Sequence, residues 1–299
     1  MDPIALALVA ASAGMHAVWN YLAKRATDSL AFLCALSTLS PLIAGSAMLI
    51  EWWLLDTVPD FSTWKLAILS GVIQASYFMF TGSGYNRGDL SVVYPLSRGV
   101  APVFIAILGV FFLKDPLSPL GSVGILLVLL GTLALASDAI RNSGDPGEQK
   151  KRASLRSHLG SSVGLGLLAA VSIALYHVVD KAGAQGATVT SYLFMMNTAM
   201  LVALTPLMLK KRRAQEIRTV FKTQRIRMII SAVLVYSAYM LVVTAMMRAP
   251  AAYVATARNL SILIGIGLGT MRLQEGRVGM RLGAGTVMLA GMTVLALGA

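Results

Sequence analysis

The fold class of this chain follows from one stretch, RGDLSVVYPLSRGVAPVFIAILGVFFLKDPLS, at residues 87–118. Between Leu90 and Leu113 its only charged residue is Arg98. An α-helix needs about 20 consecutive apolar residues to cross the hydrocarbon core of a bilayer. The stretch therefore predicts a transmembrane helix that carries an arginine inside the membrane.

The composition extends this prediction to the whole chain. Of 299 residues, 57% are hydrophobic and only 13% are charged, whereas soluble domains carry about 25% charged residues. The net charge of +12 does not indicate nucleic-acid binding, because most basic residues lie in short loops between apolar runs, where they set membrane topology. Cys34 is the only cysteine, which excludes a disulfide framework and a thiolate metal cluster.

Ten segments are long and apolar enough to span a membrane, so the sequence predicts an all-α integral membrane protein. They are 3–23, 30–50, 64–84, 90–113, 117–137, 159–179, 188–209, 228–247, 250–271 and 279–298.

Two longer polar connections interrupt these segments. Residues 141–158 are rich in turn formers and divide the chain nearly in half. Residues 210–227 are strongly basic, and their pattern fits either an interfacial amphipathic helix or a solvated loop.

The two halves share landmarks in the same order. An offset of 160 residues places Arg98 on Arg258, Leu113 on Leu273, Asp115 on Glu275 and Gly131 on Gly291, and an offset of 161 places His16 on His177. Each half has five spans, an odd number, so the second half must run inverted through the membrane. We expect a five-helix repeat at 1–140, a linker at 141–158 and an inverted repeat at 159–299. Such repeats are typical of secondary transporters that work by alternating access.

The basic residues are concentrated in the loops on one side of the predicted membrane, which include 141–158 and 210–227. Because basic loops stay in the cytoplasm, the charge bias predicts that both termini lie outside.

The 87–118 stretch and HAVWNYLAKRATD at 16–28 resemble the EamA-type branch of the drug/metabolite transporter superfamily. The resemblance covers nearly the whole chain, including an acidic turn after spans four and nine, LKDPLS and LQEGRV, of which the second lacks the proline. It implies a multi-pass protein of the bacterial inner membrane that exports amino acids or other metabolites. The family's usual arrangement places the termini inside, opposite to the charge bias.

Arg98 and Arg258 are the leading candidates for substrate binding. Arginine stays charged and can hold a carboxylate through two parallel hydrogen bonds, so each is either a carboxylate anchor or part of a structural ion pair. Pro95 and Pro102 flank Arg98 and predict a kink in span four. Span nine has no matching proline after Pro250.

His16 and His177 are expected at the depths of Arg98 and Arg258, respectively. No acidic residue falls near the middle of a predicted span, so any proton coupling would depend on these histidines; neutral packing is the alternative. Asn20 lies one turn from His16, and the corresponding pair in the second half, Asp180 and Lys181, is interpreted as an interfacial pair.

Other polar and aromatic side chains could line a substrate cavity or bond neighbouring helices. These are Trp19, Gln74, Tyr77, Tyr94, Asn197, Tyr236, Tyr239 and Asn259. Trp52, Trp53 and Trp64 instead predict an interfacial aromatic belt.

The sequence thus favours a secondary transporter that exports amino acids or similar small molecules. It calls for the lipid bilayer as its partner and for no nucleic acid, cofactor or metal, and a monomer suffices. A lipophilic-cation exporter is the alternative, but it would need a buried acid that the spans lack. A membrane-embedded enzyme is a remote alternative, because no nucleophile–base or phosphate-binding motif occurs in the spans.

Overall fold

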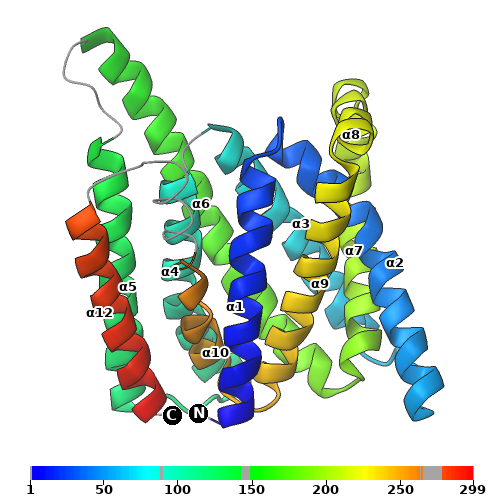
Figure 1. The fold of residues 1–299 in the computed structure, drawn as a ribbon. Coiled ribbons are helices and arrows are strands. Elements are labelled where there is room, and N and C mark those ends of the chain that lie inside the picture. The colour runs from blue at the N-terminus through cyan, green and yellow to red at the C-terminus, as the bar shows by residue number, and fades with distance from the viewer. Residues whose placement is uncertain (1, 88–89, 143–148, 263, 265–277, 299) are drawn as a thin grey trace.

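The computed structural model describes residues 2–87, 90–142, 149–262, 264 and 278–298, and these form a helical bundle without strands (Figure 1). The first half contains α1 (Pro3–Lys24), α2 (Ser29–Leu55), α3 (Trp64–Arg87), α4 (Leu90–Leu108), the π-helical η1 (Gly109–Leu113) and α5 (Pro119–Asn142). The second half contains α6 (Gln149–Gln185), α7 (Val189–Met208), α8 (Lys211–Thr223), α9 (Arg225–Met246), α10 (Ala251–Ala257) and α12 (Val278–Leu297).

The expected all-α membrane fold is confirmed. Seven described stretches are long and apolar enough to cross a membrane: Pro3–Lys24, Ser29–Leu55, Trp64–Arg87, Val93–Leu113, Ser162–Gln185, Val189–Met208 and Arg225–Met246. Two shorter apolar stretches, Pro119–Ala134 and Gly283–Leu297, coincide with the fifth and tenth predicted spans. The ninth span begins with α10, and most of its remainder lies outside the described residues.

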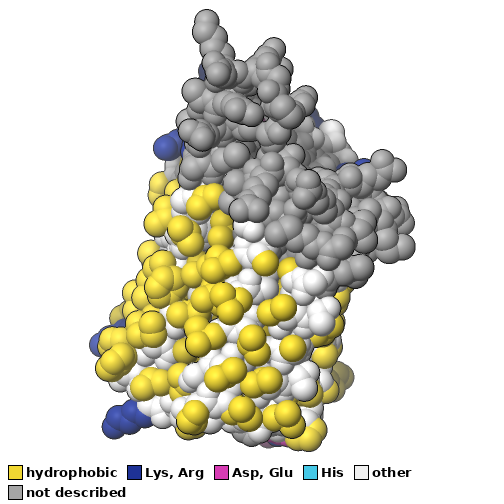
Figure 2. All heavy atoms as spheres, turned by 90° about the vertical axis from the view of Figure 1, so that its left-hand side faces the viewer, with side chains coloured by type: hydrophobic (Ala, Val, Ile, Leu, Met, Phe, Trp, Pro, Cys, Tyr) yellow, Lys and Arg dark blue, Asp and Glu magenta, His cyan; other side chains and the backbone are white. Residues whose placement is uncertain are grey.

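The outer surface is apolar, as a bilayer requires. Figure 2 shows hydrophobic side chains spread over the face formed by α5 and α12, with Lys and Arg at its margins. Phe111 and Phe112 of η1 are 76% and 74% exposed. Soluble monomers rarely expose contiguous apolar surface on this scale, so we assign these side chains to lipid contact.

Helix starts follow from local capping. The Asp2 side chain accepts a hydrogen bond from the Ile4 N–H at 3.1 Å, and Pro3 occupies the first turn of α1. The Asp28 side chain accepts one from the Ala31 N–H at 2.8 Å at the start of α2. Both arrangements satisfy backbone N–H groups that a helix start leaves free.

The two halves pack in a reciprocal way. α1 contacts α9, and α6 contacts α3, so the first helix of each half lies against the third membrane helix of the other. α2 pairs with α7 at one edge of the bundle, and α5 pairs with α12 at the other (Figure 1). Both termini lie at one end of the bundle, here called the termini end; α1 starts there, and α6 starts at the opposite end.

The α5–α12 contact repeats this reciprocity at atomic scale. A Cβ placed on Gly131 would lie 2.8 Å from the Ala284 carbonyl oxygen, and one placed on Gly291 would lie 2.9 Å from the Gly124 carbonyl oxygen. The offset of 160 residues converts the first pair into the second. Small residues allow such close helix approach in membranes. This geometry supports the inverted-repeat hypothesis, while the division at 140 and 159 stays a prediction.

Residues 210–227 were left open between a helix and a loop, and the structure shows the helix α8. Ile217 and Val220 are buried, whereas Lys211, Arg212 and Lys222 are exposed. α8 packs against α2, α7 and α9 at the opposite end (Figure 1). The apolar side of α8 therefore packs against the bundle, and its basic side faces outward.

Spans four and nine differ in continuity. α4 runs as one helix through Pro95 and Pro102, and the kink expected from these prolines stays a prediction. α10 ends at Ala257, and Arg258 and Asn259 form a turn. The N–H of Ile262 bonds to the Asn259 carbonyl, three residues back, as in a 3₁₀ turn. The interruption thus lies beside Arg258.

Candidate functional site

Two arginines are buried inside the bundle. Arg98 on α4 is 3% exposed, and Arg258, directly after α10, is 2% exposed. Arg98 Nη2 donates to the Tyr77 hydroxyl at 2.8 Å, and its guanidinium carbon lies 6.0 Å from the Tyr94 ring centroid. Nε and Nη1 of Arg98 and Nη1 of Arg258 are buried without a hydrogen-bond partner. Both side chains therefore keep unused donors in a water-poor environment.

The ion-pair interpretation of these arginines finds no support. Within the described part of the chain, no carboxylate lies within ion-pair distance of Arg98 or Arg258. The two guanidinium groups are instead close enough for their charges to repel each other. Buried charges are normally paired or hydrogen-bonded, so this arrangement is suited to hold an anion.

The two histidines occupy equivalent positions in the two halves. His16 Nδ1 lies 3.1 Å from the Ser12 carbonyl oxygen, and His177 Nδ1 lies 2.8 Å from the Ile173 carbonyl oxygen. Because a carbonyl only accepts, Nδ1 carries the hydrogen in both rings. Ring contacts through Tyr176 and Tyr77 connect His177 to Arg98, so His177 does not lie in a layer with Arg258 alone. The expected depth of His16 beside Arg98 stays a prediction.

A chain of aromatic rings connects Arg98 to α9. The Tyr77 ring lies 5.7 Å from Tyr176, which lies 5.8 Å from Tyr239 and 4.7 Å from His177. The separations are typical of interacting aromatic pairs. The two arginines, the two histidines and these three tyrosines are called the polar centre below. Sequence reasoning missed Tyr176, although it directly precedes His177.

Asp180 corrects two predictions. It is fully buried, at 0% exposure, and its partners are not Lys181 but Tyr192, Tyr239 and Gln74. The Tyr192 hydroxyl donates to Oδ1 at 2.7 Å, and Gln74 Nε2 donates to Oδ2 at 3.2 Å. Span six was predicted to end at residue 179, whereas α6 continues to Gln185. Asp180 is therefore an acid inside the bundle, which the spans were predicted to lack.

Lys181 forms a separate ion pair at the termini end. Its Nζ lies 2.5 Å from Asp115 Oδ1 and 3.2 Å from the Ala249 carbonyl oxygen. Asp115 Oδ2 accepts the backbone N–H of Ala251 at 2.8 Å. The pair ties α6 to the turn after η1 and to the start of α10. Glu275, the expected counterpart of Asp115, lies outside the described residues.

Three other predicted residues take part in contacts near the polar centre. Asn20 Oδ1 accepts the Tyr85 hydroxyl at 2.7 Å. The Tyr94 hydroxyl donates to Ser261 Oγ at 2.9 Å, joining α4 to the segment after α10. The Trp19 ring lies 6.0 Å from the His16 ring.

The remaining predicted residues fall into two groups. Asn259 is buried beside Arg258, and its Nδ2 has no hydrogen-bond partner. Asn197 Nδ2 instead bonds to the Leu193 carbonyl oxygen of its own helix at 2.7 Å. Tyr236 is buried with an unpartnered hydroxyl, and the acidic group whose charge acts on it is Glu51. No described contact joins Asn197 or Tyr236 to the arginines.

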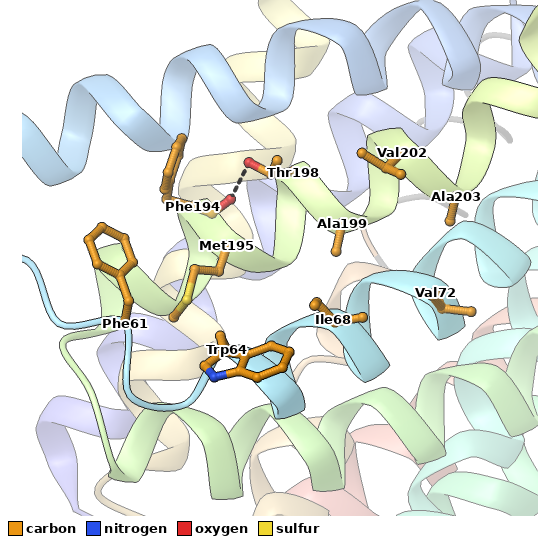
Figure 3. A pocket seen from close by; sticks show the side chains of 10 residues that line it. All are labelled: Phe61, Trp64, Ile68, Val72, Phe194, Met195, Thr198, Ala199, Val202 and Ala203. Carbon is orange, nitrogen blue, oxygen red and sulfur yellow. Dashed lines mark hydrogen bonds between the residues drawn. The ribbon is translucent and has the colours of Figure 1, made fainter.

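Three grooves lined by described residues do not include any residue of the polar centre. The groove in Figure 3 has a volume of about 440 Å³ and lies between α3 and α7, with Trp64, Ile68 and Val202 among its walls. Its lining is apolar apart from Thr198, whose hydroxyl bonds to the Phe194 carbonyl oxygen. No cluster of three His, Cys, Asp or Glu side chains occurs in the part of the chain that was placed.

Comparison with known proteins gives a family match and a fold match. Residues 3–137 match the model of a family described as the EamA-like transporter family. Among solved structures, 25 chains match; one, described as "Crystal structure of protein", has a TM-score of 0.67 and 15% identity, covering 98% of this chain and 96% of its own. At this identity the likeness shows the fold alone. No curated protein matches.

Proposed function

Because residues 3–137 of this multi-pass membrane protein belong to the EamA-like transporter family, as their resemblance indicated, we propose that the protein exports small carboxylate-bearing metabolites, amino acids first. Members of that family are transporters, not enzymes. The proposed route is alternating access through the polar centre, which opens in turn to each side of the membrane.

The observation that carries this proposal is the pair of unpaired buried arginines. Arg98 has two unused donor atoms, Nε and Nη1, and Arg258 has one, Nη1. A carboxylate has the geometry and charge to accept such donors in parallel. Its arrival would also offset the repulsion between the two guanidinium groups. Rings of Tyr77 and Tyr94 beside Arg98 offer apolar surface to the rest of the substrate.

Two structural features support alternating access. The halves pack reciprocally and run in opposite directions, so exchanging their conformations would exchange the open side. The ninth span is also interrupted by a turn at Arg258. Discontinuous helices near the membrane midplane commonly form transporter binding sites. The Lys181–Asp115 pair and the Arg248–Asp2 pair fasten the termini end. Opening the termini end would have to break both pairs.

We place the protein in the bacterial inner membrane with both termini outside, as the loop charges predict. In that orientation, opening the termini end releases substrate from the cell. A single chain contains both halves, so a monomer is sufficient for the proposed cycle.

A lipophilic-cation exporter is the second candidate. The sequence argument against it was the lack of a buried acid, and Asp180 removes that argument. Both Asp180 oxygens are already occupied by hydrogen-bond donors, however, whereas the arginines are not saturated. The positive polar centre therefore favours a carboxylate over a cation.

Matched ligand pairs distinguish these candidates. We would measure the thermal unfolding of purified protein with amino acids, with the corresponding amino-acid amides, and with tetraphenylphosphonium. A ligand at 100 times its Kd stabilises the folded state by about 2.7 kcal/mol. We expect stabilisation by at least one amino acid and none by its amide, which lacks the carboxylate.

The variants Arg98→Gln and Arg212→Gln complete this experiment. Arg98→Gln should lose the stabilisation, whereas Arg212, whose side chain is 92% exposed on α8, should be replaceable without effect. Stabilisation by the cation alone would support the second candidate. Equal stabilisation by acid and amide would contradict the role of the arginines.

A further inference from the structure

The carboxyl group of Asp180 joins four helices. Asp180 belongs to α6, and it accepts hydrogen bonds from α3 (Gln74), α7 (Tyr192) and α9 (Tyr239). It lies roughly one and a half turns before the end of α6, toward the termini end (Figure 1). This group is called the Asp180 clamp below. It holds together helices that belong to both halves.

No cation compensates the charge of Asp180 in the described residues. The adjacent Lys181 extends to Asp115 instead, and no ion pair involving Asp180 is present within the placed part of the chain. An ionised carboxylate in a membrane interior is expensive, and such residues commonly mark ion or proton pathways. The clamp thus contains an acid that is neither exposed to water nor neutralised.

The hydrogen bonds allow both protonation states. Oδ2 accepts from Tyr239 and Gln74, and Oδ1 accepts from Tyr192; the Ser70 hydroxyl of α3 is a further partner of this carboxyl group. A carboxylate oxygen has about two acceptor sites, so Oδ1 has room for a proton. A tyrosine hydroxyl either donates or accepts. When Oδ1 is protonated, it can donate to the Tyr192 hydroxyl, whose own hydrogen then turns away.

We propose that Asp180 is a proton-binding site that controls the closure of the termini end. Ionised Asp180 holds α3, α7 and α9 through charge-assisted hydrogen bonds, which are about twice as strong as neutral ones. One proton added to Oδ1 cancels the charge, weakens the clamp and favours opening. In the open state water reaches the carboxyl group and takes up this proton, so that ionised Asp180 can close the termini end again. This inference rests on the proposed transport function and makes transport responsive to a proton gradient.

The surroundings place this site next to the polar centre. The titratable and charged groups of the polar centre on the surrounding elements are Tyr176 and His177 on α6, Tyr77 on α3, Tyr239 on α9, Arg98 on α4 and Arg258 after α10. Lys181 on α6 is paired with Asp115. The Tyr239 ring contacts both Tyr176 and His177. A conformational change in the Asp180 clamp can therefore be transmitted to the arginines through these packed rings.

Infrared difference spectroscopy tests the proton site without a known substrate. Purified protein in lipid would be titrated with pH while the carbonyl band of a buried, protonated carboxylic acid is recorded. We expect this band in the wild type and its loss in Asp180→Asn. Asp56→Asn is the matched control, because Asp56 is exposed at the end of α2, and it should retain the band. Tyr192→Phe should shift the pH midpoint of the band.

An unchanged band in Asp180→Asn would overturn the inference, and so would its absence from the wild type. A transport arm then tests the coupling. In liposomes, a pH gradient should stimulate counterflow of a labelled amino acid by wild type but not by Asp180→Asn. If wild type transports an amino acid but a pH gradient does not stimulate this transport, the proposed control by Asp180 is refuted and the proposed transport function is not. Wild type that does not transport any amino acid refutes the proposed function, while the infrared result still decides the protonation of Asp180.

Discussion

Asn20 and Asp180 lie at corresponding places near the ends of the first helix of each half, four residues after His16 and three residues after His177, yet they differ in chemistry. Asn20 lies about one turn before the end of α1 and accepts a hydrogen bond from Tyr85 of α3. Asp180 lies near the end of α6 and accepts one from Tyr239 of α9. Because the halves run in opposite directions (Figure 1), the two positions lie toward opposite ends of the bundle.

The comparison shows how a symmetric scaffold can become directional. Both ends are fastened by a polar side chain that bonds a tyrosine of the third membrane helix in the same half. Of these two side chains only Asp180 can change its charge, since an amide does not titrate. Protonation would therefore weaken the Asp180–Tyr239 contact and leave the Asn20–Tyr85 contact unchanged.

The largest effect is expected from breaking the buried ion pair at the termini end. Lys181→Met would leave Asp115 buried without its partner, which typically costs about 3–5 kcal/mol. Arg213→Met is the matched change at the opposite end, where the Arg213–Asp28 pair is more exposed and should contribute about 1 kcal/mol or less. Thermal unfolding in lipid measures both variants, and equal losses would contradict the difference between the ends.

The two arginines allow the next test of the comparison. Hydrogen bonds to charged groups are worth about 1.5–3 kcal/mol, so Arg98→Gln should raise the half-saturating substrate concentration about 10- to 100-fold. Arg258→Gln has fewer unused donors to lose and should have the smaller effect. The concentration dependence of flux would show this order, and a larger effect at Arg258 would reverse the assignment of the main anchor.

Alanine substitutions at two glycines distinguish the close packing of α5 against α12 from a general effect of helix propensity on stability. A Cβ on Gly131 would lie 2.6 Å from Met288 Cγ, whereas one on Gly14 meets nothing within 4 Å. Gly131→Ala should therefore destabilise the α5–α12 contact by about 1–3 kcal/mol. Gly14→Ala should be neutral or stabilising by up to about 1 kcal/mol. If both variants unfold at the wild-type temperature, the close α5–α12 contact is not present in solution.

The smallest expected effect is the pH-dependent contribution of Asp28 to stability at the opposite end of the bundle. Burial raises the pKa of the Asp28 carboxyl, but hydrogen bonds from Ala31, Asn86 and Arg213 outweigh it and leave the pKa below its ordinary value. An aspartate whose pKa is lowered in the folded protein stabilises the fold at pH values above its unfolded-state pKa, which is about 3.9. This stabilisation is lost as the pH falls through the folded-state pKa.

We therefore expect wild type to exceed Asp28→Asn in unfolding temperature near neutral pH and to lose that advantage below about pH 4. The difference should stay within about 1 kcal/mol, because the group is partly exposed. A constant difference across this pH range would show that the Asp28 charge does not contribute.

Most of the helices could be predicted from apolar length alone, because a bilayer requires it. Arg98, Arg258, His16 and His177 could also be predicted, since charged or titratable side chains inside apolar runs stand out. The Asp180 clamp could not, because its partners Gln74 and Tyr192 lie on other helices and α6 extends beyond its apolar run.

The helix interruption at Arg258 could not be predicted for a related reason. Proline is the strongest local signal for a distorted helix, and it predicted a kink in span four. The turn at Arg258 has no such signal in the local sequence.

The measurement that tests the account most directly is counterflow in liposomes. Vesicles containing the purified protein would be loaded with an unlabelled amino acid and diluted into the same amino acid in labelled form. The account predicts transient accumulation of label above equilibrium by wild type and an initial rate about 10-fold or more lower by Arg98→Gln when the substrate is well below half-saturation. Uptake no greater than in protein-free vesicles for every amino acid, or equal accumulation by Arg98→Gln, would contradict it.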